Sequence, residues 1–240
     1  MGKVRINKFL AECGICSRRE ADRLVEQGKV MLNGTRAVMG DQVSSEDHVA
    51  VSGKSVVNRC EPVVLAYHKP VGVTCTQKDR HAERTIKDAV DYPVRVTYAG
   101  RLDKDSEGLI LLTNDGNLID AMMRGANRHE KEYLVKVNKE ITADFLKGMA
   151  SGVYLEELEL KTRECLLEQK GKYTFRIVLT QGLNRQIKRM CRVFGAEVLS
   201  LKRIRVMGIG LGDIKPGSYR VIKGEELRCL YHDAGLKITE

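Results

Sequence analysis

From residue 63 onward, segments with the pattern of β-strands outnumber segments with the pattern of helices. Tight turns between them are frequent, and Gly171-Lys172 lies in the middle of one predicted hairpin. Short strands joined by tight turns favour antiparallel pairing. We therefore predict an α+β fold with a mixed, mostly antiparallel sheet, and not a doubly wound parallel sheet. The predicted strands are 63–67, 94–99, 109–112, 133–137, 165–168 and 174–179, and the predicted helices are 118–124, 143–149, 185–194 and 225–231.

The segment before residue 60 has a different pattern, with two short helices followed by a small strand region. Ser17, with Glu20 three residues later, is typical of a helix N-terminus. Asn33-Gly34 follows an apolar run and can supply the positive φ angles of a two-residue hairpin turn. We predict a small α-rich domain over residues 1–59, a linker at about 53–62, and a second domain over 63–240.

The composition is that of a soluble chain with a substantial core. Of the 240 residues, 42% are hydrophobic and 30% are charged. We find no run of about 18 apolar residues and no apolar signal region behind the first residues. Cys13 and Cys16 have CxxC spacing but no second pair follows, so the cysteines are interpreted as reduced thiols, not as metal ligands. We expect a cytoplasmic protein that does not associate with membranes.

The formal net charge of +9 favours a polyanionic partner. The positive charge is concentrated late in the chain, because residues 184–205 carry seven Lys or Arg residues against the single acid Glu197. On charge alone, a phosphate-facing surface and an ordinary solvated helix face are equally good interpretations.

The stretch 99–116 is a polar loop held between two apolar segments, a layout in which scaffolds often present working residues. Asp103 has a cation on each side, and such cations keep a carboxylate ionised and nucleophilic. Gly100 and Gly108 bracket the loop and permit close approach of a ligand. From these residues alone, a charged turn with a surface ion pair is the competing interpretation.

Residues 100–116, GRLDKDSEGLILLTNDG, resemble the signature of the RsuA-type bacterial rRNA pseudouridine synthases. Residues 68–74, HKPVGVT, resemble the first motif of this family, although many members have Asn in place of His68. Residues 181–190, QGLNRQIKRM, resemble its third motif, and residues 124–133, RGANRHEKEY, are most similar to its RluF branch. Residues 4–51 resemble an S4 RNA-binding domain, through RINKFL, SRREA and VMLNG.

The resemblance implies isomerisation of a uridine in ribosomal RNA, and the RluF-like stretch favours 23S over 16S rRNA. A tRNA stem-loop of similar shape is a possible second substrate. The reaction breaks the C1′–N1 bond, rotates the uracil and rejoins it through C5, so we expect no cofactor, no metal and no obligate protein partner. The aspartate either adds covalently or removes the 2′ proton on a glycal route, and both routes stay open.

The resemblance also implies roles for particular residues, with Asp103, Tyr133 and Lys188 as the catalytic set. Tyr133 would stack on uracil, and Lys188 would pair with the aspartate, where many members carry Arg. The residues expected to bind substrate are Arg101, Leu102, Arg185, Gln186, Arg189 and Leu211. Those expected to bind phosphates from the S4-like domain, on one shared face, are Arg5, Lys8, Ser17, Arg18, Arg19, Lys29 and Asn33.

The sequence argues against three other functions. A non-catalytic RNA-binding protein would not need the combination of Asp103, Tyr133 and Lys188. A DNA-binding regulator would need a helix-turn-helix with its own dimerisation surface, which the sequence lacks. A metal-dependent nuclease would need clustered ligands, whereas the histidines are scattered and Asp103 with Asp105 are too few.

Overall fold

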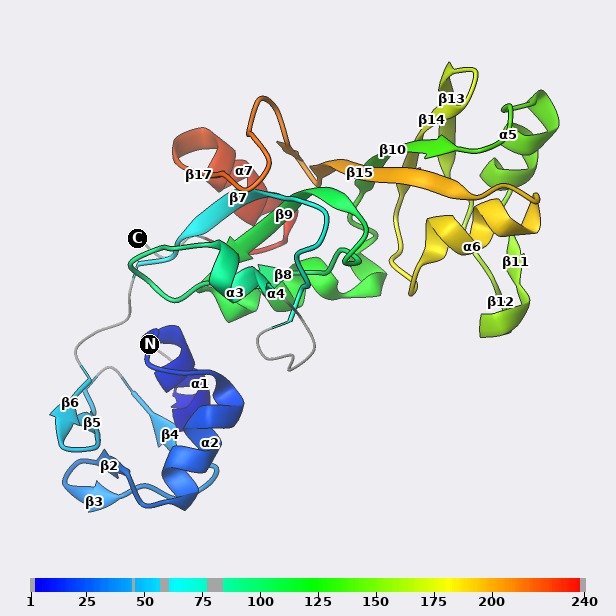
Figure 1. Cartoon of the computed structure of the whole chain (residues 1–240). Coiled ribbons are helices and arrows are strands. Elements are labelled where there is room, and N and C mark those ends of the chain that lie inside the picture. Colours follow the sequence, from blue (N-terminus) through cyan, green and yellow to red (C-terminus); the bar gives the residue numbers. More distant parts are fainter. Residues whose placement is uncertain (1–2, 45, 57–60, 77–83, 238–240) are drawn as a thin grey trace. The chain divides into compact units, whose positions relative to one another are not determined.

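The computed structural model describes residues 3–44, 46–56, 61–76 and 84–237, which fall into two compact units (Figure 1). The first unit takes residues from 1–63, 92–97 and 114–116, and the second takes the remainder. Part of the predicted linker, residues 57–60, lies outside the described residues.

The first unit consists of two helices and six short strands. Ser17 precedes the second helix, and its Oγ accepts a hydrogen bond from the Glu20 backbone N–H at 3.2 Å, so the predicted N-cap is confirmed. Asn33 and Gly34 have φ values of 50° and 84° and form the predicted hairpin turn. The elements are β1 (Val4–Arg5), α1 (Ile6–Glu12), α2 (Arg18–Glu26), β2 (Val30–Leu32), β3 (Thr35–Arg36), β4 (Gln42–Val43), β5 (Val49–Val51) and β6 (Lys54–Ser55).

A small apolar core holds the first unit together. Ile6 and Leu10 of α1, Ala21 and Val25 of α2, and Val30 of β2 are all buried in it. The i, i+4 spacing in each helix puts both side chains on the face that meets the strands. β6 pairs with β5, so residues 54–55 of the expected linker belong to this sheet.

The second unit is built on a nine-stranded sheet with the path β13-β14-β10-β15-β9-β7-β17, and the predicted α+β class is confirmed. β9 and β15 pair in parallel, whereas the other pairings along this path are antiparallel. The strands on this path are β7 (Val64–Lys69), β9 (Glu107–Thr113), β10 (Lys131–Val137), β13 (Leu166–Gly171), β14 (Thr174–Leu179), β15 (Val198–Val206) and β17 (Tyr219–Val221).

Shorter elements complete the second unit. The remaining strands are β8 (Thr97–Ala99), β11 (Tyr154–Leu155), β12 (Leu160–Lys161) and β16 (Ile209–Gly210). The helices are α3 (Ile86–Ala89), α4 (Gly116–Met123), α5 (Ala143–Ala150), α6 (Gln186–Val193) and α7 (Gly224–Asp233), with 3-10 turns η1 (Gly125–Asn127) and η2 (Glu156–Leu158). No helix in the described part of the chain is long and apolar enough to cross a bilayer.

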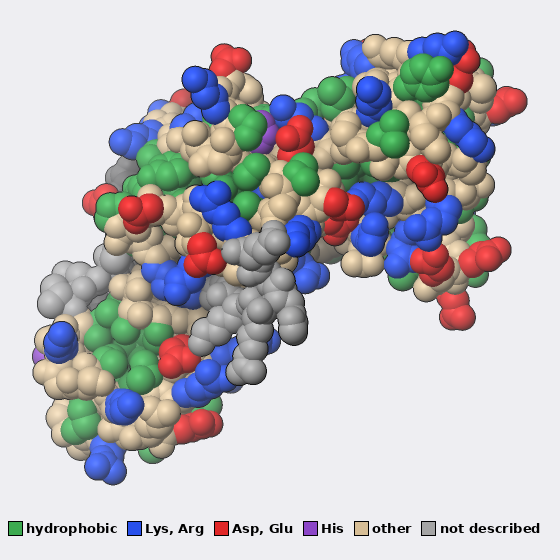
Figure 2. All heavy atoms as spheres, viewed as in Figure 1, with side chains coloured by type: hydrophobic (Ala, Val, Ile, Leu, Met, Phe, Trp, Pro, Cys, Tyr) green, Lys and Arg blue, Asp and Glu red, His purple; other side chains and the backbone are tan. Residues whose placement is uncertain are grey.

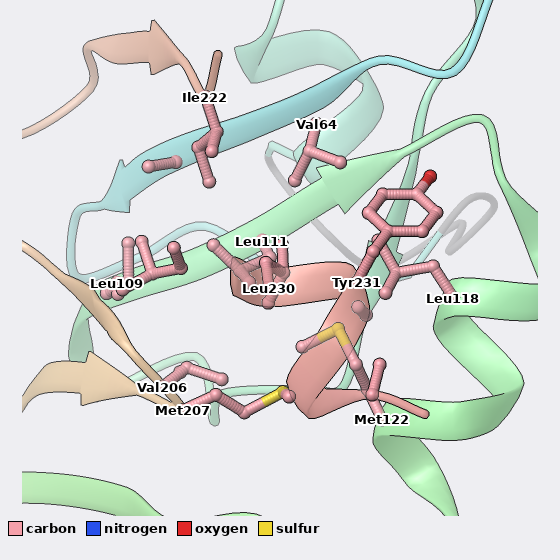
Figure 3. Close-up of a cluster of buried hydrophobic side chains, with 14 of the residues drawn as sticks. Val64, Leu109, Leu111, Leu118, Met122, Val206, Met207, Ile222, Leu230 and Tyr231 are labelled. Carbon is pink, nitrogen blue, oxygen red and sulfur yellow. The ribbon is translucent and has the colours of Figure 1, made fainter. Parts of the chain in front are cut away.

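The main apolar cluster lies between the sheet and two helices. Figure 3 shows Leu109 and Leu111 of β9 facing Leu230 of α7, with Leu118 and Met122 of α4 beside them. All of these side chains are buried, and each one fully removed from water contributes roughly 1.5–3 kcal/mol. The cluster fixes β9, and with it the end of the loop that carries Asp103.

The sequence pattern did not predict β15, although it is the longest strand of the sheet. Its sequence, VLSLKRIRV, alternates apolar residues with Lys202, Arg203 and Arg205, and we interpreted these cations as part of a surface strip. In the structure Arg203 is only 2% exposed. A central strand can hold such a residue because its neighbours supply hydrogen-bond acceptors.

The parallel contact between β9 and β15 requires glycine at position 108. Gly108 has φ +114°, and a Cβ placed there would lie 2.2 Å from the Arg203 carbonyl oxygen and 2.5 Å from its nitrogen. These are backbone atoms of a central strand, so they cannot move aside as a side-chain end could. Gly108 therefore permits the close approach of the two strands.

We predict that Gly108→Ala lowers the free energy of unfolding by about 3 kcal/mol or more, because it combines backbone strain with overpacking. Urea denaturation of the full chain measures this. Gly210→Ala is the matched control, since no atom lies within 4 Å of a Cβ at that position. Equal stability of the two variants would contradict the proposed constraint.

Candidate functional site

Asp103 lies in the loop between β8 and β9, and the segment after β7 anchors this loop. The Gly72 N–H donates to the Lys104 carbonyl at 2.8 Å, and the Ser106 N–H donates to the Asp103 carbonyl at 3.1 Å. The Leu102 N–H points to the Cys75 Sγ at 3.4 Å. These bonds hold the backbone on both sides of Asp103, so the loop that carries the carboxylate is ordered before any ligand binds.

Lys69 is a second anchor, and we did not predict it as a site residue. Its side chain is fully buried, and Nζ donates to the carbonyls of Pro70 at 2.9 Å and Val73 at 2.8 Å, with Lys104 at 3.5 Å. Burial lowers its pKa. The HKPVGVT motif was the available signal, but the sequence does not say that this lysine turns inward to support the loop.

Lys188 of α6 reaches the aspartates of this loop. Its Nζ lies 3.9 Å from Asp103 Oδ2 and in direct contact with Asp105 Oδ2. Arg185, which precedes α6, places Nη2 3.9 Å from Asp105 Oδ2. The Lys188 side chain is 12% exposed, whereas that of Asp105 is 58% exposed. A mostly buried lysine side chain therefore shares its ammonium between two carboxylates, and Asp105 holds it more closely.

The charge of Lys188 affects the pKa of Asp105. Burial raises the pKa of this carboxyl, but the hydrogen bond and charge of Lys188 and the charge of Arg185 outweigh burial and hold it below its usual value. The cluster therefore carries an ionised carboxylate and an ammonium side by side.

Tyr133 and Arg203 lie next to each other on β10 and β15. They are register partners, so their side chains leave the same face of the sheet. Tyr133 is 9% exposed and Arg203 is 2% exposed. Arg203 Nε donates to the Leu109 carbonyl at 2.6 Å, and its Nη2 has no hydrogen-bond partner among the described residues. The sequence motifs identified Tyr133 but not this buried arginine.

The structure places three of the predicted substrate-binding residues in the interior, and one of them is Leu102, which is 7% exposed. Gln186 is 4% exposed, and its Oε1 accepts from the Leu183 N–H at 3.1 Å, so its side chain braces the start of α6. Leu211 is 4% exposed and belongs to the main apolar cluster. Arg101 is exposed, and Arg189 donates through Nε to the Asn184 carbonyl at 3.0 Å.

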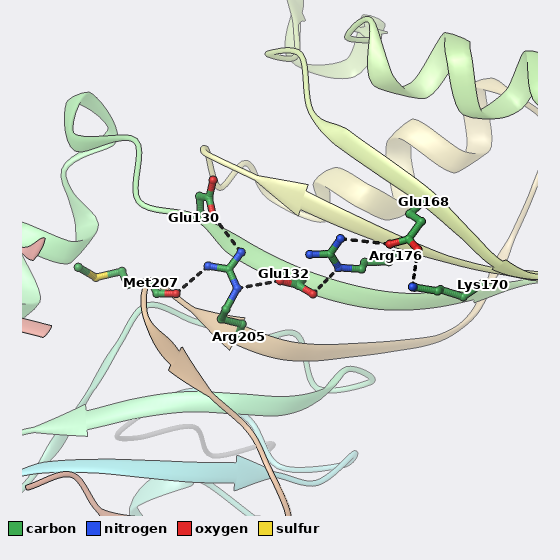
Figure 4. A network of polar contacts seen from close by, with 7 residues as sticks. All are labelled: Glu130, Glu132, Glu168, Lys170, Arg176, Arg205 and Met207. Atoms are coloured by element: carbon green, nitrogen blue, oxygen red, sulfur yellow. Dashed lines mark hydrogen bonds and ion pairs between the residues drawn. The ribbon is translucent and has the colours of Figure 1, made fainter. Parts of the chain in front are cut away.

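The basic stretch 184–205 is not one phosphate-facing surface, and this corrects our expectation. Arg205 donates to Glu132 at 2.7 Å and to Glu130 at 2.9 Å (Figure 4). The same network includes Arg176, which bridges Glu132 and Glu168. Arg205 is thus paired with acids inside the sheet and Arg203 is buried, so the stretch does not form one continuous basic surface.

The residues predicted to bind phosphates in the first unit have different surroundings. Five of them are exposed to solvent, namely Arg5, Arg18, Arg19, Lys29 and Asn33. Lys8 Nζ lies 3.7 Å from Glu12 Oε1. The Asn33 amide donates to Asp47 at 2.7 Å and accepts from the His48 N–H at 2.8 Å, so it stabilises the hairpin.

Comparisons with known proteins assign both parts of the chain. The family model for RNA pseudouridylate synthase matches residues 63–192, and the S4 domain model matches residues 4–49. The chain is 49% identical over 230 residues to the dual-specificity RNA pseudouridine synthase RluF of Escherichia coli K12, covering 95% of this chain and 78% of that protein. An uncharacterised RNA pseudouridine synthase of Aquifex aeolicus is 35% identical, and the match covers 99% of this chain and 97% of that protein. A crystal structure of a pseudouridylate synthase matches with a TM-score of 0.69 and 28% identity, covering 95% and 99%.

We predict that Lys188→Gln raises the pKa of Asp105, because burial then acts without the opposing ammonium. In the wild-type chain the pKa of Asp105 is lower in the folded state than in the unfolded state. Its ionised carboxylate therefore stabilises the fold at any pH above the unfolded-state pKa, and this stabilisation is lost as the pH falls through the folded-state pKa. Carboxyl titration by NMR measures the shift. Lys202→Gln is the control, since Lys202 lies 3.9 Å from Glu107. An unchanged Asp105 titration in Lys188→Gln would contradict this electrostatic account.

Proposed function

The chain belongs to the RNA pseudouridylate synthase family, and from this we propose that it converts one uridine of 23S ribosomal RNA to pseudouridine, with Asp103 as the catalytic carboxylate. Two observations support the choice of RNA. Residues 124–133 resemble the RluF branch, and the E. coli relative carries the name RluF. Since that relative is named as a dual-specificity enzyme, we also propose a second RNA substrate for this chain, a tRNA stem-loop of similar shape.

The reaction rearranges the substrate without an external donor. The C1′–N1 bond breaks, the uracil turns, a C1′–C5 bond forms, the C5 proton leaves and N1 gains a proton. Electrons and atoms balance within the nucleotide and water, so the proposed reaction uses no cofactor, no metal and no obligate protein partner. The proposed place of action is the cytoplasm, where ribosomal RNA is made.

The contact of Lys188 with the aspartate loop is the observation that carries the proposal. Covalent addition and removal of the 2′ proton both use the carboxylate of Asp103, and the Lys188 ammonium lies 3.9 Å from its Oδ2. The bonds from the segment after β7 hold the backbone of the loop, so little ordering of the loop is needed when the nucleotide arrives.

The other residues have supporting roles in this proposal. Tyr133 supplies a flat ring for uracil and a hydroxyl for proton transfer. Arg101, Arg185 and Arg189 bind backbone phosphates around the flipped nucleotide, and Leu102 lies next to the base. Gln186 and Leu211 act indirectly, by holding α6 and the apolar cluster in place.

We propose residues 1–59 as an S4 module that binds RNA, and residues 63–240 as the catalytic domain. The S4 family match at residues 4–49 and the exposed cations of the first unit support this division. Phosphate contacts of this kind position the enzyme on folded RNA and carry little sequence information.

Asp103→Asn is expected to keep the fold and the affinity for RNA but to slow pseudouridine formation by at least about a thousandfold, because the amide cannot act as nucleophile or base. Pseudouridine mapping of an unmodified 23S transcript after incubation measures this. Asp213→Asn is the matched control, since Asp213 is exposed. Normal product from Asp103→Asn would remove this residue from the mechanism.

The triple variant Arg5→Gln, Arg19→Gln, Lys29→Gln tests the S4 module. Each lost phosphate contact reduces the slope of log K against log salt by about 0.7–0.9, so the total reduction should be about 2–3. Titrations of 23S transcript between low and moderate salt measure this slope. Arg228→Gln, in α7 and paired with Glu225, should leave it unchanged. A slope equal to that of the wild-type chain would exclude these cations as phosphate contacts.

A further inference from the structure

A cavity of about 210 Å³ lies between α6 and the segment that contains β11 and η2. It is distinct from the aspartate loop, and Arg189 is the one lining residue that already has a role in the proposed function. Its lining residues are Tyr154, Leu155, Glu156, Glu157, Arg189, Arg192 and Val193. A space of this size accepts one planar ring, but not a folded RNA element.

The walls of the cavity include apolar side chains that the fold leaves exposed. Tyr154 is 56% exposed and Val193 is 57% exposed, while Leu155 beneath them is 3% exposed. An aromatic ring gains by stacking on another flat ring, and every nucleobase has such a face. Tyr154 therefore provides a stacking surface for a base.

The polar groups around the cavity are balanced in charge. Glu157 contacts Arg189, and its Oε1 lies 3.1 Å from Arg192 Nη1. Two guanidinium groups and two carboxylates line the site, so it offers donors and acceptors without a net positive charge. This suits the edge of a nucleobase, which carries both kinds of group, better than a phosphate, which carries acceptors and negative charge.

Helix α6 contributes residues both to the cavity and to the cluster around Asp103. Lys188 contacts the aspartate loop, and Arg192 is one turn further along the helix, a rise of about 6 Å. Stacked nucleotides are about 3.4 Å apart, so this distance corresponds to about two nucleotides. Figure 2 shows Lys and Arg side chains gathered over α6, with Asp and Glu side chains beside them over the β11–β12 segment.

We propose that this cavity binds an unpaired nucleobase of the substrate RNA, close to the target uridine. The base stacks on Tyr154, Glu157 and Arg192 bind its edge, and the cations of α6 bind the phosphates between it and the catalytic loop. The site selects RNAs that present a second unpaired base beside the uridine. This inference rests on the proposed function, because it takes RNA as the ligand of α6.

Tyr154→Ala tests the stacking surface, with Tyr173→Ala as the matched control. Tyr173 is also exposed, at 41%, but lies in the β13–β14 turn outside the cavity. Loss of one stacked base weakens binding by about tenfold, so Tyr154→Ala should raise Kd and KM for unmodified 23S transcript by that factor, with kcat within about twofold. Tyr154→Phe keeps the ring and should bind as the wild-type chain does.

Ultraviolet crosslinking gives a second readout. After irradiation with the same transcript and digestion to nucleotides, mass spectrometry should find a nucleotide adduct on the wild-type peptide that contains Tyr154, and none on the peptide that contains Tyr173. Equal Kd values for Tyr154→Ala and Tyr173→Ala, or an absent Tyr154 adduct, would overturn the base site. Lack of pseudouridine from the wild-type chain would instead overturn the proposed function, and the Kd comparison would still decide the site.

Discussion

The parallel contact between β9 and β15 joins the two halves of the catalytic sheet. β7 and β17 lie on one side of this contact, and β10, β14 and β13 lie on the other. Gly108 allows the strands to approach, and the buried Arg203 ties them through the Leu109 carbonyl. The candidate site depends on this contact, because the Asp103 loop leads into β9 while Tyr133 lies on β10 in the other half of the sheet.

The loop that carries Asp103 is held mainly by backbone hydrogen bonds and by Lys69, whose side chain is fully buried. Lys69 satisfies its ammonium with carbonyl oxygens, so it braces the loop without pairing with the carboxylates. Lys188, in contrast, pairs with the aspartates, and together with Arg185 its charge lowers the pKa of Asp105 by more than burial raises it. Two lysines of the same charge thus have different tasks, which follow from what surrounds each one.

Local sequence predicted the elements whose pattern agrees with their surroundings. β14 (Thr174–Leu179) has the predicted bounds, and the Ser17 cap and the Asn33-Gly34 turn are present, because capping and turn formation depend on neighbouring residues. β15 was missed because Arg205 pairs with Glu132 and Arg203 donates to the Leu109 carbonyl, and both partners lie on strands far away in the sequence. The same reason explains why Arg203 and Lys69 were not recognised as interior residues.

The sequence by itself determined the two-part organisation, the α+β class and the motif that contains Asp103, since these depend on periodicity and on short contiguous runs. Only the tertiary structure decided which cations face solvent, which aspartate holds Lys188 more closely, and that α6 and β11 enclose a cavity. Those features depend on contacts between residues far apart in the chain. Burial and pairing change the energy of a charge by more than its local neighbours do, so composition and spacing could not reveal them.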